Sequence, residues 1–183
     1  MKIKSFGFLT AAVIMASASN ANASMLFDIY AGGTFGMGGY TLLSDQNISH
    51  SSQSYGAILG IDIPLARLEL EYNYMDSDNT TLNLGLINAY FKLPTPVIKP
   101  YIGAGIGTTF ATSKYEPTAS TSIEIQDTIA YQGMLGVTFD IPVMPFNIDL
   151  EGRVLYASDL FKVATNEYDL LQYEGRIKIR YVF

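Results

Sequence analysis

Cysteine is absent from this sequence, and histidine occurs only once. Without cysteine the chain has no disulfide bridge, no thiolate zinc site and no thiol nucleophile. One histidine leaves little for metal binding or acid–base catalysis. Charged residues are also scarce, at 15% of the 183 residues, against roughly 25% in ordinary soluble domains. The formal net charge of −6 argues against a nucleic-acid partner, because nucleic acids attract basic surfaces.

Long apolar runs and tryptophan are missing as well. No run reaches the ~18 to 20 apolar residues that a membrane-spanning helix needs. Hydrophobic residues nevertheless make up 49% of the chain, and 13 Tyr and 10 Phe give it a high aromatic content. This composition is too apolar for a disordered chain, and the length suits a single domain.

Residues 1–23 have the form of a secretory signal peptide. Lys2 and Lys4 precede the apolar stretch Phe8–Ala16, and small residues end at Ala21-Asn22-Ala23. A positive start, a short apolar middle and an A-x-A site are the features of a cleaved signal. We expect cleavage after Ala23, which leaves residues 24–183 as the mature domain.

Alternation of apolar and polar residues with a period of two recurs eight times in the mature chain. This alternation is typical of β-strands, and helical periodicity is not sustained anywhere. Strands of about 10 residues have the length that a tilted strand needs to cross a membrane. The segments are Met25–Met37, Tyr55–Asp62, Arg67–Met75, Thr81–Leu93, Tyr101–Ala111, Asp127–Asp140, Asn147–Ala157 and Tyr173–Phe183.

The connections between these segments alternate between two kinds. The short, proline-containing ones are Ile63–Ala66, Pro94–Pro100 and Ile141–Phe146. The polar and mostly longer ones are Leu42–Ser54, Asp76–Thr80, Thr112–Gln126 and Ser158–Gln172. In an up-and-down meander every second connection lies at the same end. One end therefore has tight turns and the other has loops, as in bacterial outer-membrane barrels.

Aromatic residues on the apolar faces of the segments indicate what those faces contact. Near the loop end these faces carry Phe35, Tyr55, Tyr74, Phe110, Tyr131, Tyr156 and Tyr173. Near the turn end they carry Phe27, Phe91, Phe139, Tyr181 and Phe183, with aliphatic residues between the two groups. Two aromatic girdles around an aliphatic belt match the two interfaces of a membrane. The sequence therefore predicts an all-β, eight-stranded, antiparallel up-and-down transmembrane barrel whose apolar face contacts lipid.

The segment Thr81–Leu93 does not keep a single pattern along its length. Ile87 and Phe91 fit the lipid face. If the alternation continued unchanged towards the start of the segment, Leu82, Leu84 and Leu86 would point inward. One extra residue in a strand exchanges the faces of every later side chain. We therefore expect a β-bulge near Gly85 that returns these leucines to the outside.

Charged residues fill the opposite faces, which are predicted to line the interior. An eight-stranded barrel is just wide enough to be filled by its own side chains, and buried charges need partners. We predict a filled, non-conducting interior in which inward glycines such as Gly60, Gly103 and Gly136 leave room for longer side chains. The predicted ion-pair network is Arg67, Glu69, Glu71, Asp149, Glu151, Arg153, Glu174, Arg176, Lys178 and Arg180, with Lys92, Asp28, Asp62 and Asp140 completing the interior charges.

Three stretches resemble motifs of the opacity-protein-like porin superfamily, which is related to the transmembrane domain of outer-membrane protein A. Lys99–Gly107 resembles its fifth strand, and Tyr131–Val137 resembles its sixth. Ile179, Tyr181 and Phe183 are similar to the alternating terminal signal that the barrel-assembly machinery recognises. The resemblance covers the mature chain and implies an outer-membrane barrel without a cofactor, in a family that serves adhesion and envelope integrity alike.

We expect a non-enzymatic protein of the bacterial outer membrane that is exposed at the cell surface and surrounded by outer-membrane lipid. The loops 42–54, 112–126 and 158–172 are expected to bind an extracellular or host-surface ligand. Two alternatives stay open. One is a porin-like passage for small solutes or hydrophobic ligands. The other, more distant, is a lipid-modifying enzyme built on His50 with Ser51 and Asp45.

Deletion of Phe183 separates its role in assembly from a merely structural one. We expect strongly reduced membrane insertion in cells and nearly intact refolding of purified protein in detergent, because only cells use the assembly machinery. As one more girdle aromatic, Phe183 would contribute only its buried area, on the order of 1.5–3 kcal/mol. Loss of both insertion and refolding would assign Phe183 to stability alone, and survival of both would contradict the terminal signal.

Overall fold

The computed structural model describes residues 27–43, 48–77, 80–111, 123–125, 128–140, 144–163 and 166–183. The predicted signal peptide lies outside these residues. No helix in the described part of the chain is long and apolar enough to cross a membrane. The described strands are β1 (Asp28–Leu43), β2 (Ile48–Asp62), β3 (Ala66–Ser77), β4 (Thr80–Lys92), β5 (Ile98–Ala111), β6 (Ile123–Ile125), β7 (Ile129–Asp140), β8 (Phe146–Val163) and β9 (Asn166–Val182).

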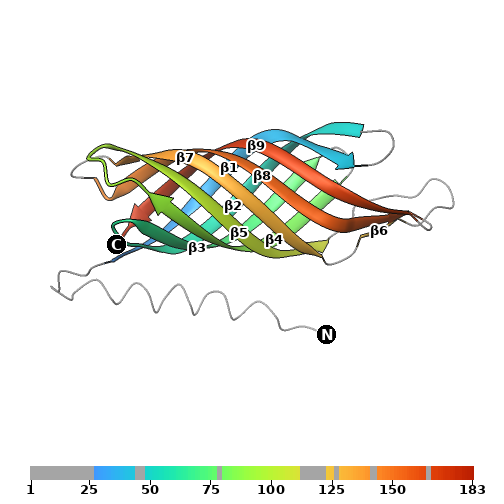
Figure 1. The fold of residues 1–183 in the computed structure, drawn as a ribbon, viewed down its shortest axis with the longest axis horizontal. Coiled ribbons are helices and arrows are strands. Elements are labelled where there is room, and N and C mark those ends of the chain that lie inside the picture. Colours follow the sequence, from blue (N-terminus) through green and yellow to red (C-terminus); the bar gives the residue numbers. More distant parts are fainter. Residues whose placement is uncertain are drawn as a thin grey trace.

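Eight of these strands form a closed antiparallel barrel. Each long strand pairs with its sequence neighbours in an up-and-down order, and β9 pairs with both β8 and β1. Figure 1 shows these strands inclined to the long axis of the barrel. The predicted eight-stranded barrel is therefore confirmed. The short strand β6 lies within the predicted loop 112–126 and pairs with β8, from Ile123↔Val163 to Ile125↔Phe161.

Strands at the loop end run further than the alternation predicts. The hairpin of β1 and β2 continues to Leu42↔Ile48, so most of the predicted loop 42–54 is strand. The hairpin of β8 and β9 likewise continues to Val163↔Asn166, within the predicted loop 158–172. The sequence analysis took the polar residues of these segments as a sign of loop. They are strand because backbone pairing continues beyond the point where the apolar outer face ends.

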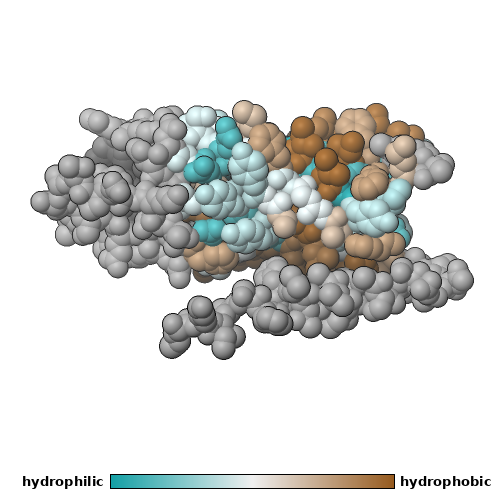
Figure 2. Space-filling view, turned by 180° about the vertical axis from the view of Figure 1, so that it is seen from behind, coloured by the Kyte–Doolittle hydropathy of each residue, from teal (hydrophilic) through white to brown (hydrophobic). Residues whose placement is uncertain are grey.

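Apolar side chains cover the outer surface of the barrel. The terminal residues Ile179, Tyr181 and Phe183 all face outward, as do the predicted aromatic residues at both ends. At the turn end the Tyr181 ring lies 5.1 Å from the rings of both Phe146 and Phe183, in edge-on contacts. Figure 2 shows hydrophobic residues gathered over one part of the wall and more hydrophilic residues over the adjacent part. The apolar belt thus surrounds the barrel but does not extend over its whole height.

The predicted bulge near Gly85 is wrong. β4 pairs without interruption with β3, from Ser77↔Thr80 to Ala66↔Phe91, and likewise with β5. Leu82, Leu84 and Leu86 accordingly stay inside the barrel, each no more than 3% exposed. The expectation failed because it assumed a polar interior at every height, whereas this part of the interior is apolar. The register shift that the described strands do show lies between Ala157 and Phe161, on β8.

An outward arginine should strongly lower the free energy of unfolding within the apolar belt and hardly change it on the loop side of the belt. Ile177 on β9 and Gln53 on β2 both face outward, but Gln53 lies on the loop side of the Tyr55 girdle position. We expect Ile177→Arg to lower the free energy of unfolding by about 2–4 kcal/mol and Gln53→Arg by about 0–1 kcal/mol. Urea unfolding in lipid vesicles measures both values. Equal losses would contradict the assigned height of the belt.

Candidate functional site

The ten residues of the predicted network lie together in the turn-side part of the interior. Arg67, Glu69 and Glu71 project from β3, and their partners project from β8 and β9, which pair with each other but not with β3. All ten side chains are fully buried. Five cationic and five anionic side chains balance in charge, which is the condition under which buried charges are tolerated. We call these ten residues the ionic layer.

Ion pairs in the ionic layer cross the barrel from β3 to β8 and β9. The Arg67 guanidinium lies 2.9 Å from the Asp149 carboxylate, and Lys178 Nζ lies 3.0 Å from Glu69 Oε1. Arg176 pairs with both Glu71 and Glu151. Arg67–Asp149, Lys178–Glu69 and Arg176–Glu71 connect β3 to strands that are not its neighbours in the sheet, whereas Arg176–Glu151 joins the paired strands β9 and β8. The first three pairs therefore fix the interior across its width.

The pairs continue along β8 and β9 towards both ends. Arg153 Nη2 lies 2.6 Å from Glu174 Oε1. At the turn side, Arg180 binds Asp149 through Nε at 2.9 Å and Asp62 through Nη1 at 3.3 Å. Every cation of the ionic layer therefore has at least one carboxylate partner.

Tyrosines that the sequence analysis did not assign to the network complete the ionic layer. Tyr30 and Tyr90 donate hydrogen bonds to Glu69 at 2.7 and 2.9 Å, and Tyr101 donates one to Glu151 at 3.0 Å. The Arg67 guanidinium carbon lies 4.2 and 4.7 Å from the ring centroids of Tyr90 and Tyr101, a cation–π arrangement. Nε and Nη2 of Arg67 are buried and donate no hydrogen bond to a described residue, so the rings are the interaction that the structure offers to this face of the guanidinium.

Three inward glycines make room for these tyrosines. A Cβ atom at Gly103 would lie 2.3 Å from the ring of Tyr90. The corresponding distances are 2.4 Å for Gly60 from Tyr30 and 2.6 Å for Gly136 from Tyr101. A larger residue at any of these positions would displace the ring. The inward glycines and the tyrosines therefore form matched pairs, a signal already present in the alternation of the sequence.

Apolar side chains occupy the loop-side part of the interior, next to the ionic layer. This apolar layer was missed by the sequence analysis, although three inward leucines on one segment were its signal. Across β2, β3 and β4 the outward residues at this end are polar, including Gln53, Asp76 and Asn83. On these three strands the loop end thus has polar residues outside and apolar residues inside, as in a soluble protein. The members of the apolar layer are Tyr40, Met75, Leu82, Leu84, Leu86, Ala130, Leu155, Ala157 and Leu170, all at most 4% exposed.

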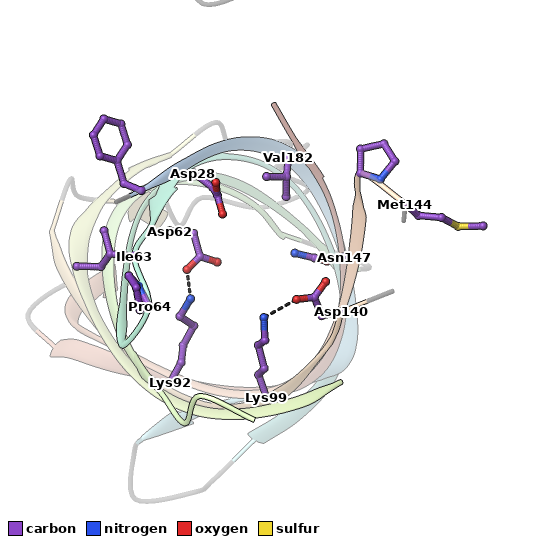
Figure 3. Close-up of a pocket in the computed structure, with 12 residues that line it drawn as sticks. Asp28, Asp62, Ile63, Pro64, Lys92, Lys99, Asp140, Met144, Asn147 and Val182 are labelled. Atoms are coloured by element: carbon purple, nitrogen blue, oxygen red, sulfur yellow. Dashed lines mark hydrogen bonds and ion pairs between the residues drawn. The ribbon is translucent and has the colours of Figure 1, made fainter. Parts of the chain in front are cut away.

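A cavity of about 490 Å³ opens at the turn end of the barrel. Figure 3 shows Lys92 and Lys99 pointing from β4 and β5 into this cavity, towards Asp62 and Asp140 respectively. Asp28 is exposed at the mouth. The sequence analysis assigned Asp28 and Asp140 to the closed interior, but both lie at this opening because they stand at strand ends. It also missed Lys99. We call this cavity the turn-end vestibule.

The enzyme alternative falls largely outside the described side chains. His50 lies on β2 opposite Tyr40, but its side chain and Asp45 are not among the described ones. Ser51 is exposed. Among the described residues, no group of three or more His, Asp or Glu is arranged to hold a metal ion.

No protein-family model matches the chain, and no curated protein matches it in sequence. Among solved structures it is similar to Neisserial surface protein A (NspA), with a TM-score of 0.62 and 18% identity over 82% of this chain and 96% of that chain. It is also similar to the N-terminal β-barrel domain of Pseudomonas aeruginosa OprF, with a TM-score of 0.55 and 15% identity over 83% of this chain and 97% of that chain. Both are eight-stranded outer-membrane barrels. The predicted resemblance is confirmed at the level of the fold.

Replacing a cation of the ionic layer by an uncharged residue should lower the free energy of unfolding far more than replacing a cation of the vestibule. Arg176→Met leaves Glu71 and Glu151 buried without their main partner, and we expect a loss of about 3–5 kcal/mol in unfolding free energy. Lys99→Met breaks a pair whose side chains are 29% and 33% exposed, so its loss should be about 0–1 kcal/mol. Denaturant unfolding of both variants in vesicles gives the comparison. Similar losses would mean that the ionic layer is open to water.

Proposed function

We propose that this protein is a non-enzymatic integral barrel of the bacterial outer membrane with a sealed interior. The observation that carries the proposal is the inverted polarity of the wall. Large apolar side chains such as Leu68, Ile102 and Leu135 are 58–68% exposed on the outside, while the charges of the ionic layer are fully buried. In water such an outer surface would aggregate, whereas in a bilayer it is the stable arrangement.

The location follows from the fold and from the sequence together. Transmembrane barrels of this kind belong to the outer membranes of bacteria, and the signal peptide predicted at residues 1–23 provides for export. The outward, alternating residues Ile179, Tyr181 and Phe183 supply the terminal pattern proposed to engage the barrel-assembly machinery.

The filled interior supports a structural role over passage of solutes. A permeating ion would have to disrupt the paired charges of the ionic layer and then cross the apolar layer around Leu82, Leu84 and Leu155. Each step is costly, because one leaves buried charges unpaired and the other strips the ion of its water. Asp62, which lines the vestibule, also pairs with Arg180, and Arg180 is buried and held in addition by Asp149.

Surface exposure at the loop end supports a second part of the proposal, which is contact with an extracellular or host-surface ligand. The hairpins of β1 with β2 and of β8 with β9 continue beyond the apolar belt into the segments 42–54 and 158–172, and the segment 112–126 follows β5 in the chain. Binding residues are commonly placed on such loops above a rigid scaffold. The ligand itself is identified by a binding screen that compares the intact chain with loop-trimmed protein.

Planar-bilayer recording tests the sealed interior. We expect no stable conductance from protein that is shown to be folded by a difference in gel migration between unboiled and boiled samples. A closed, compact barrel resists detergent until it is heated. A general porin reconstituted in parallel shows that channels are detectable. Reproducible single-channel currents from the folded protein would favour the passage alternative, and identical migration of the two samples would contradict the barrel itself.

A further inference from the structure

The turns of this barrel are unusually apolar for a surface that faces water. The exposed residues of the two fully described turns include Ile63 and Leu65 in one, and Leu93 and Val97 in the other, at 42–50% exposure. Met144, beside the third turn, is 60% exposed. The described positions 63–65, 93–97 and 144–145 contain no charged residue. An exposed apolar rim of this kind marks a surface that contacts lipid or a partner.

The turn-end vestibule inside this rim is charged and contains both signs. Lys99 and Asp140 form a pair that is about one-third exposed, while the pair of Lys92 and Asp62 lies deeper, at 7% and 15% exposure. Asp28 lies at the mouth, beside Phe27. A lysine ammonium has three donors, and the Lys99 ammonium has a single ion pair, with Asp140, among the described residues. Donors and carboxylates therefore stand next to one another within one cavity of about 490 Å³.

We propose that the turn-end vestibule binds the headgroup of a zwitterionic aminophospholipid from the adjacent membrane leaflet. The Lys99 ammonium meets the lipid phosphate, and the Asp28 carboxylate meets the lipid ammonium. The apolar rim around Phe27, Ile63 and Met144 contacts the acyl chains. The inference rests on the proposed membrane location, and it adds a binding site that this location alone does not require.

Charge complementarity favours this ligand over others. An anionic phospholipid offers a phosphate for Lys99, but it has no cation for the carboxylate of Asp28, whereas Asp62 and Asp140 already pair with Lys92 and Lys99. A quaternary ammonium headgroup carries the charge but has no N–H to donate. A primary ammonium beside a phosphate satisfies both signs, and charge-assisted hydrogen bonds are the stronger kind. A soluble zwitterion would fit the charges but would leave the apolar rim exposed.

Native mass spectrometry of the folded protein in detergent micelles tests this assignment. Phosphatidylethanolamine, phosphatidylglycerol and phosphatidylcholine with identical acyl chains are added separately, and the bound lipids are counted. We expect phosphatidylethanolamine to be retained in preference to the other two. The variants Lys99→Gln and Asp28→Asn should each weaken its binding about tenfold, the effect of losing one hydrogen bond to a charged group. Lys162→Gln, on β8 at the opposite end of the barrel, is the matched control and should bind like wild type.

Four results would overturn the proposal. They are no retained phosphatidylethanolamine on the folded protein, equal retention of phosphatidylglycerol, unchanged binding by Lys99→Gln, and displacement of the lipid by an equal concentration of soluble glycerophosphoethanolamine. The last would indicate a soluble zwitterion instead of a membrane lipid. Gel migration of unboiled samples reports folding of every variant. Failure of wild-type protein to insert into vesicles would count against the proposed function, whereas insertion without lipid retention counts against this site alone.

Discussion

This structure depends on one requirement, which is that every backbone amide group must find a hydrogen-bond partner within the chain. Lipid offers no hydrogen bonds, so a sheet that faces lipid must close on itself. Closure is achieved by pairing β1 with β9, from Tyr30↔Val182 to Leu43↔Asp169. Once the sheet is closed, alternate side chains of every strand point either to the surroundings or into a narrow interior. The belt, the ionic layer and the apolar layer are all consequences of that division.

The interior is filled by different kinds of side chain at its two ends. The turn-side part contains charges, and each cation of the ionic layer is paired with a carboxylate from another strand. Such pairs contribute little net stability, because desolvation offsets their attraction. Their effect is to specify one arrangement, since Glu71 and Arg176 meet only when β3 and β9 have the correct register. The loop-side part contains Leu82, Leu84 and their neighbours, and gains stability by ordinary apolar burial.

The position of the barrel relative to the apolar belt explains features of both ends. At the loop end, outward residues such as Gln53 and Asp76 are polar and the interior is apolar, which is the arrangement of a soluble barrel in water. At the other end the belt continues into the turns, where Leu65 and Val97 are exposed. On the proposed location, the membrane-embedded zone is therefore displaced towards the turns, and the charged vestibule opens near a lipid interface.

Local pattern was sufficient for the fold class, the number of barrel strands and the direction of the faces outside the segment Thr81–Leu93, because alternation with period two is a property of neighbouring residues. It also indicated the charges of the ionic layer, but it did not indicate their partners, since Arg67 and Asp149 are brought together only by closure. The inward direction of Leu84 was decided by the tertiary structure, because uninterrupted pairing of β4 with both neighbours fixes its register. The same holds for Lys99 and Asp28, which line one vestibule only because strand ends distant in the sequence converge at the turn end.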